Sequence, residues 1–262
     1  MNAFEVKGLI QELIDENPFA IRALLKIVAV EFTEAVPTLA VTAEERPRLL
    51  ISLGFVNAHC RTDEQVKAVL CHEFLHVLLR HTTLKGPLTP ARHLALDAVI
   101  NAIIHRQLGA AYSSLMAEYY RDAQGLMQLL RPHREDERGQ MWETRNHHDR
   151  RQPWWPAWHG LYDGRVLADD IEDLAKSCNE KVPDTVLLQD LLGNHANDEP
   201  LSDALEAALD RARREMNGGG IWRNAGPGAN PYEILVNPKQ AALAEWKAKT
   251  LAVLHKHLEP AP

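Results

Sequence analysis

The spacing of apolar and polar positions predicts a mostly helical chain with a small sheet near its start. Residues 2–16 have the amphipathic pattern of a helix. Asn17-Pro18 offers a cap followed by proline at the first helical position, which predicts a second helix to about residue 35. The runs 38–43 and 48–54 are short and β-prone, and we interpret them as two strands joined by a turn.

Capping signals then predict two long helices in succession. The stretch 62–65 has the form of a capping box, and the helix that it starts is expected to end near residue 85, before Gly86-Pro87. Thr89-Pro90 repeats the cap-then-proline signal and predicts a helix over 90–108. A tight turn at Gly86-Pro87 would make these two helices antiparallel neighbours.

The rest of the chain is less regular. We expect a helix over 113–130, a polar segment over 131–160, and further helices over 166–177, 201–216 and 238–257. The polar segment holds four of the six tryptophans, at positions 142, 154, 155 and 158. This Trp-rich segment fits either core packing under a long loop or the lining or lid of a substrate cleft.

One stretch, "CHEFLHVLLRH" (71–81), sets polar groups among apolar residues. His72 and His76 are four residues apart, so on a helix they share one face and can hold a single metal ion. Imidazole nitrogens suit zinc, and Glu73, beside the first histidine, can act as general base toward a water on the metal. The alternative is a helix that carries this short pattern by chance.

The third metal ligand is sought on the next predicted helix. His81 lies nine residues after His72, on the opposite face of a continuous helix, so we assign it a surface or supporting role. The helix over 90–108 carries a polar stripe at four-residue spacing: His93, Asp97, Asn101 and His105. Similar helix lengths on the two sides of the turn bring Asp97 level with His76, which predicts Asp97 as the third ligand.

Asn101 lies one helical turn beyond Asp97, where it could orient a ligand histidine. The alternative is that Asp97 and Asn101 pair with each other or with an arginine. A hydrolytic site would also need a donor to a developing oxyanion and an exposed strand edge for substrate. Either predicted strand could be that edge, and the sequence offers as possible donors His105, Tyr119, Tyr120, His147, His148 and His159.

Composition narrows the setting. A net charge of −7 gives no basic excess for phosphates, which argues against nucleic acid as a partner. No apolar run approaches the ~20 residues of a membrane span, and the acidic, amphipathic start is unlike a signal peptide. The three cysteines are widely spaced and lack a C-x-x-C pair, which fits a reducing cytoplasm better than a disulfide framework.

Several segments resemble a bacterial metallopeptidase-like family whose domain often precedes a von Willebrand factor A-like domain. They are "TLAVTAEERPRLLISLGFV", "VLCHEFLHVLLRH" and "LALDAVINAII". The H-E-x-x-H followed about twenty residues later by an acidic residue is also similar to the gluzincin arrangement of zinc peptidases, with Asp97 in place of glutamate. The D-x-S-x-S signature of the second domain does not occur in the sequence.

The resemblance implies a mostly helical α+β fold of zincin type, with a small early sheet packed on the H-E-x-x-H helix and an antiparallel ligand helix. We expect residues 1–130 to form this metal-binding domain, and residues 131–262 to pack on it. The implied function is a zinc-dependent metallopeptidase acting on a peptide or protein, of a family assigned largely by its motif. The alternative is a catalytically silent zinc-binding module, regulatory or partner-binding, on the same fold. The sequence does not indicate an oligomeric state.

Overall fold

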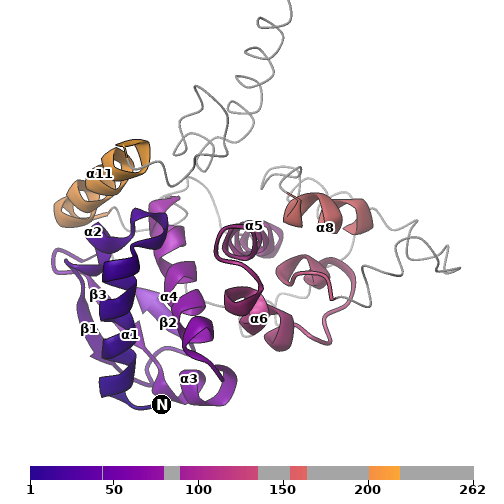
Figure 1. The fold of residues 1–262 in the computed structure, drawn as a ribbon, viewed down its shortest axis with the longest axis horizontal. Helices are drawn as coiled ribbons and strands as arrows, with labels where there is room; N and C mark the ends of the chain where they lie inside the picture. Colours follow the sequence, from indigo (N-terminus) through magenta and orange to yellow (C-terminus); the bar gives the residue numbers. More distant parts are fainter. Residues whose placement is uncertain (43, 80–88, 135–153, 164–200, 219–262) are drawn as a thin grey trace, which may run out of the picture.

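The computed structural model describes residues 1–42, 44–79, 89–134, 154–163 and 201–218 (Figure 1). Within these ranges the protein is mostly helical, with one mixed sheet of three strands, so the predicted α+β class is confirmed. Among these residues, none of the helices combines the length and the apolar character that a membrane span requires.

The first helix, α1 (Ala3–Glu16), follows its sequence signals closely. Asn2 accepts hydrogen bonds from the first turn, and the Glu5 side chain accepts one from the Asn2 backbone, which completes a capping box. Four apolar side chains on one face are buried. The helix ends where Asn17 adopts the left-handed conformation, with φ 52°.

The helix predicted from Asn17-Pro18 to about residue 35 is wrong. Only a 3₁₀ turn, η1 (Pro18–Ala20), and one turn of helix, α2 (Arg22–Leu25), form there. The chain then extends as strand β1 (Ala29–Phe32). The cap-then-proline signal marks a helix start but not its length, and the Val- and Phe-containing strand gains a full parallel ladder with β3.

The sheet has the order β1-β3-β2. Strands β2 (Leu39–Val41) and β3 (Arg48–Ile51) are antiparallel, which confirms the two strands expected from the sequence over slightly longer ranges. Strand β3 ends early because Ser52 caps the short helix α3 (Leu53–His59). Since β3 is paired on both sides, it cannot be the free edge considered for it, whereas β2 is an edge strand of the sheet that the described residues form.

Helix α4 (Asp63–Leu78) runs through the centre of the fold, between α1 and the sheet on one side and the later helices on the other (Figure 1). Thr62 caps it through the backbone N–H of Gln65, as predicted. All its residues from Gln65 to Leu78 are buried. A helix covered on every side is apolar nearly all round, so its few polar groups must be satisfied inside the protein.

Helix α5 (Pro90–Leu108) has the predicted bounds and packs on α4. Thr89 caps its start, and Gly109 ends it with φ 89°. The predicted end of the preceding helix near residue 85 and the Gly86-Pro87 turn lie outside the described residues, as does His81.

The single helix predicted over 113–130 is wrong. Instead, α6 (Ala110–Tyr119) ends and a 3₁₀ segment, η3 (Gly125–Leu130), follows. Gly125 takes φ 58° at the start of η3, a conformation that interrupts a right-handed helix. The chain changes direction between α6 and η3, which lets the end of η3 reach α5.

The two described helices that follow residue 153 pack on elements from earlier in the chain. Helix α8 (Trp154–Tyr162), inside the segment expected to be a polar loop, packs on α5 and η3. Helix α11 (Asp203–Gly218) matches the expected 201–216 helix and packs on α2 and η1. The helices expected over 166–177 and 238–257 lie outside the described residues. The division at residue 130 remains a prediction.

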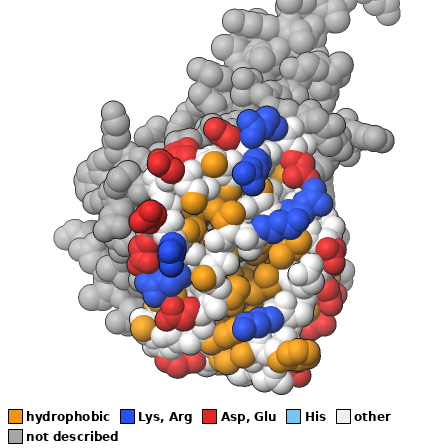
Figure 2. All heavy atoms as spheres, turned by 90° about the vertical axis from the view of Figure 1, so that its left-hand side faces the viewer, with side chains coloured by type: hydrophobic (Ala, Val, Ile, Leu, Met, Phe, Trp, Pro, Cys, Tyr) orange, Lys and Arg blue, Asp and Glu red, His pale blue; other side chains and the backbone are white. Residues whose placement is uncertain are grey.

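The face on the side of α1 and the sheet shows apolar side chains interspersed with charges of both signs (Figure 2). It is not a continuous basic surface of the kind that binds phosphate backbones. Phe4 of α1 is 85% exposed, which is unusual for a large apolar side chain. A group of fully buried polar side chains lies instead inside the protein, between α4 and α5.

Candidate metal centre

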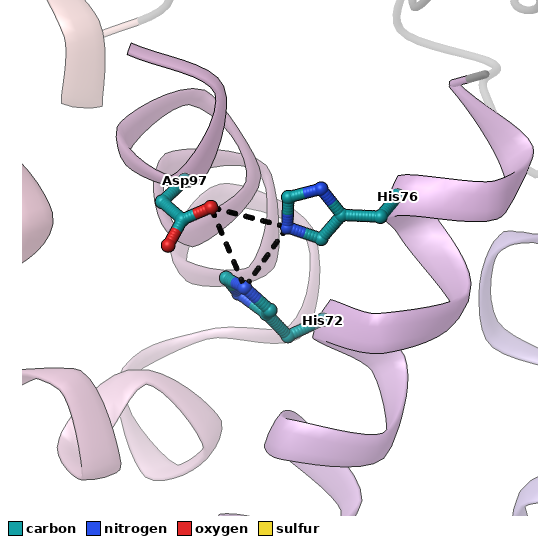
Figure 3. Close-up of side chains that lie close together, drawn as sticks. All are labelled: His72, His76 and Asp97. Carbon is teal, nitrogen blue, oxygen red and sulfur yellow. Dashed lines mark hydrogen bonds and ion pairs between the residues drawn. The ribbon is translucent and has the colours of Figure 1, made fainter. Parts of the chain in front are cut away.

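His72 and His76 lie one turn apart on α4 and point toward Asp97 of α5 (Figure 3). Their Nε2 atoms are 3.1 Å apart. The Asp97 Oδ1 atom is 3.2 Å from Nε2 of His76 and 3.9 Å from Nε2 of His72. All three side chains are at most 1% exposed. The two helices therefore bring two imidazoles and one carboxylate to a common point.

These distances fit a shared metal ion. With Zn–N bonds of about 2.0–2.1 Å and tetrahedral angles, two ligand atoms lie about 3.3 Å apart. Two of the three separations are within a few tenths of an ångström of that value, and the third exceeds it by about half an ångström. The group formed by His72, His76 and Asp97 could thus bind a metal ion.

Asn101 connects this group to the rest of the fold. Its Oδ1 lies 2.9 Å from Nδ1 of His72, and its Nδ2 donates to the carbonyl of Leu130 over 2.9 Å. The amide is fully buried, and both of its ends are used. The Asn101 amide therefore bonds to His72 and Leu130, and not to Asp97 as in the alternative interpretation. Its contact with His72 is the one expected of a residue that orients a ligand histidine.

Glu73 lies beside the first histidine and is 2% exposed. Its Oε1 has no hydrogen-bond partner among the described residues. Burial raises the pKa of its carboxyl well above the usual value. A carboxyl with a raised pKa and an oxygen without a hydrogen-bond partner among the described residues can take up a proton more readily than an ordinary glutamate.

Asp97 is affected by the same environment. Burial raises the pKa of its carboxyl well above the usual value, and the charge of Glu73 raises it further. Two buried carboxyls in one region disfavour each other's ionised form. A metal cation placed between the histidines and Asp97 would reverse that effect, because it favours ionised oxygen ligands.

His93 lies at the margin of the group. It is 5% exposed, and its Nε2 is 3.7 Å from Asp97 Oδ1, one turn earlier on α5. It does not belong to the set of atoms that could share one ion. Burial lowers the pKa of its imidazole to about 4, so the ring is neutral at physiological pH. His93 is therefore a neighbour of the proposed ligands rather than one of them.

The other candidates from the sequence are placed differently. Nδ1 of His105 lies 2.7 Å from the Ser113 hydroxyl, and the His105 ring packs against Tyr162. Tyr119 packs with Phe55, His59 and Tyr120 near α3. His159 stacks on His133 with ring centroids 4.0 Å apart. His81, His147 and His148 lie outside the described residues.

The structure also shows a contact to Asn101 that sequence reasoning missed. The carbonyl of Leu130, at the end of η3, holds Asn101 in place. A backbone carbonyl carries no residue-type signal, and it lies 29 positions from its partner. Only the three-dimensional path of η3 reveals it.

Comparison of the chain with protein-family models, with curated proteins and with solved structures finds no match.

Proposed function

We propose that this protein is a zinc-dependent metallopeptidase of zincin type. The observation that carries the proposal is the convergence of His72 and His76 with Asp97 from the neighbouring helix. Two imidazoles and one carboxylate are a donor set typical of catalytic zinc, which keeps a position open for water or substrate. The resemblance of the H-E-x-x-H and "LALDAVINAII" segments to metallopeptidase-like domains points the same way.

Zinc bound there would act as a Lewis acid and lower the pKa of a coordinated water to about 7. Glu73 is the general base in this proposal. Its unpartnered Oε1 would accept a proton from the attacking water and return it to the leaving amine. The raised pKa of Glu73 suits both steps, because the group can hold the proton between them.

The fold also offers a place for a peptide substrate. Strand β2 is an edge of the sheet and packs against α4, the helix that carries Glu73. An extended peptide could add to such an edge through backbone hydrogen bonds. We therefore propose a peptide or protein as substrate and β2 as the docking edge. The buried, unpaired Cys60 and Cys71 are compatible with a cytoplasmic setting, which we propose from the composition.

The test compares zinc-loaded wild-type protein with Glu73→Gln on a library of unstructured peptides. We expect the variant to bind zinc as wild type does and to lose about 10²–10⁴-fold in turnover, since it lacks the proton acceptor. Metal content and peptide cleavage are measured on the same samples. Cleavage by Glu73→Gln at the wild-type rate would refute the assigned base.

A second candidate is a zinc-binding module without turnover. The observation that favours it is burial: His72, Glu73, His76 and Asp97 are each at most 2% exposed, so a substrate would have to displace what covers them. The same experiment separates the two candidates. Zinc-loaded wild-type protein that cleaves no member of the library would favour the silent module.

A further inference from the structure

Three successive backbone carbonyls at the end of η3 each accept a hydrogen bond from a different buried side chain. The carbonyl of Leu129 accepts from the Tyr162 hydroxyl at 3.3 Å, and that of Arg131 accepts from Trp158 Nε1 at 2.7 Å. Between them, the carbonyl of Leu130 accepts from Asn101 Nδ2. Two of the donors therefore belong to α8, and the third belongs to α5.

This arrangement determines how the Asn101 amide is oriented. Only the NH₂ end of an amide can donate to a carbonyl, so Nδ2 faces Leu130 and Oδ1 faces His72. Because Oδ1 can only accept, Nδ1 of His72 must carry the ring proton in the neutral imidazole. The lone pair is then on Nε2, the atom that faces His76 and Asp97.

The side chains through which α8 contacts η3 are buried. Trp158 is 1% exposed and Tyr162 is 6% exposed. The Arg131 guanidinium lies over the Trp158 ring, 4.8 Å from its centroid, which adds a cation–π contact to the hydrogen bond. The path of the three carbonyls is thus held from one side by α8, while Asn101 uses the middle carbonyl from the other side.

We propose that α8 is a brace for the metal centre, in which Trp158 and Tyr162 are positioning residues. They hold the end of η3 so that the Leu130 carbonyl orients Asn101, and Asn101 orients His72 with the Nε2 lone pair toward His76 and Asp97. This gives the described part of the Trp-rich segment, α8, a role distinct from a substrate lid. The inference rests on His72 being a metal ligand, as in the proposed function.

The test uses Trp158→Phe, which removes the indole N–H but keeps an aromatic ring, and Tyr162→Phe, which removes only the hydroxyl. Zinc affinity is measured by competition with a chromophoric chelator. We expect each variant to bind zinc about 3- to 10-fold more weakly, as expected for the loss of one hydrogen bond that acts through another group. Asn101→Ala should weaken zinc binding by about 10- to 100-fold.

A double-mutant comparison shows whether the residues act along one path. If Trp158 acts through Asn101, Trp158→Phe should change zinc affinity by less than about twofold in the Asn101→Ala background. Leu161→Ala is the matched control, because Leu161 is buried on α8 at 2% exposure and has no polar side-chain atom. It should lower the stability of the protein yet leave zinc affinity within about twofold of wild type.

The protonation site of His72 gives a second readout that needs no metal. Two-bond ¹⁵N–¹H spectra of the metal-free protein should show His72 with its proton on Nδ1 in wild type and in Leu161→Ala. In Trp158→Phe and in Asn101→Ala, the spectra should show a mixture of the two tautomers, because the fixed acceptor is loosened or lost.

The two readouts separate failure of the brace from failure of the proposed function. Unchanged zinc affinity and an unchanged His72 tautomer in both α8 variants would overturn the brace, and so would an equal loss of affinity in Leu161→Ala. A wild-type protein that binds no zinc would refute the proposed function. In that case a tautomer change in Trp158→Phe would still show that α8 orients His72 through Asn101, although not for zinc, and an unchanged tautomer would overturn that path as well.

Discussion

Helix α4 carries two clusters of polar groups within about one and a half turns of each other, and the two are built in opposite ways. In the first, Lys67 lies with its Nζ 2.7 Å from Glu12 and 2.6 Å from Glu16, both on α1. Its side chain is 8% exposed, while the two glutamates are about half exposed. In the second, the carboxyls of Glu73 and Asp97 are buried with the two histidines.

The pKa values show what the difference means. Burial alone would lower the pKa of Lys67, but its hydrogen bonds to Glu12 and Glu16 outweigh burial and raise it. For Glu73 and Asp97 the pKa is raised mainly by burial, so their ionised forms are disfavoured. The Lys67 cluster thus favours its charges as the chain folds, whereas burial disfavours the carboxylate charges of the second cluster, and a bound cation would reverse that effect.

The largest expected effect is that of zinc on the second cluster. Zinc added to metal-free wild-type protein should stabilise it by about 4 kcal/mol at a free concentration 1,000 times the Kd. Thermal unfolding with and without zinc, in a metal buffer, measures the shift. Asp97→Asn should show little of it, because the variant loses one of the three proposed ligands, while Lys67→Met should show all of it. Equal shifts in the two variants would contradict the contrast between the clusters.

Removing a charged group from the metal-free protein should change its free energy of unfolding differently in the two clusters. Lys67→Met leaves Glu12 and Glu16 without their cation and should destabilise the protein by about 1–3 kcal/mol, less than a fully buried pair because the glutamates are exposed. Asp97→Asn replaces a carboxyl that burial disfavours with a neutral group of the same shape. It should be neutral or stabilising by up to about 1 kcal/mol.

Urea unfolding in the presence of a strong chelator measures both variants against wild type. Destabilisation of the metal-free protein by Asp97→Asn as large as that by Lys67→Met would mean that the ionised Asp97 is already satisfied by the fold. The two clusters would then be alike, and the proposal that the second cluster binds a cation would lose this support.

The sequence predicts those parts of the site that depend on helix geometry. The four-residue spacing of His72 and His76 and the caps at Thr62 and Thr89 follow from local rules. Together with a tight turn they also predict that Asp97 reaches the level of His76, which the structure shows. Local signals are sufficient here because each helix is long, well capped and regular.

What the sequence does not predict depends on contacts between distant segments. Strand β1 was missed because its pairing with β3 overrides a helix-start signal. The end of α6 at Tyr119 and the path of η3 from Gly125 were missed because the apolar pattern continues past both positions, and an isolated glycine does not by itself end a helix. The hydrogen bonds of Asn101 and Trp158 to backbone carbonyls depend on that path, so they could not be predicted either.

The smallest expected effect is the pH dependence of the contribution that Lys67 makes to stability. Lys67 has a folded-state pKa raised above its ordinary value of about 10.5, so its contribution to stability is complete below that pH and is lost as the pH rises through the raised value. The difference in unfolding free energy between wild type and Lys67→Met should therefore be constant from pH 7 to about 10 and then shrink.

Urea unfolding of both proteins at several pH values up to about 11 measures this difference. Tyr112, whose hydroxyl donates to Glu16 and whose pKa is raised to about 12 by burial, titrates in the same range. Tyr112 and Lys67 influence each other's pKa, so both proteins carry Tyr112→Phe in this measurement, which removes the titration of the phenol. A difference that grows above pH 10 would mean that Lys67 is held in its neutral form. The Lys67 cluster would then disfavour its charge just as the Glu73 and Asp97 carboxyls do, and the contrast along α4 would disappear.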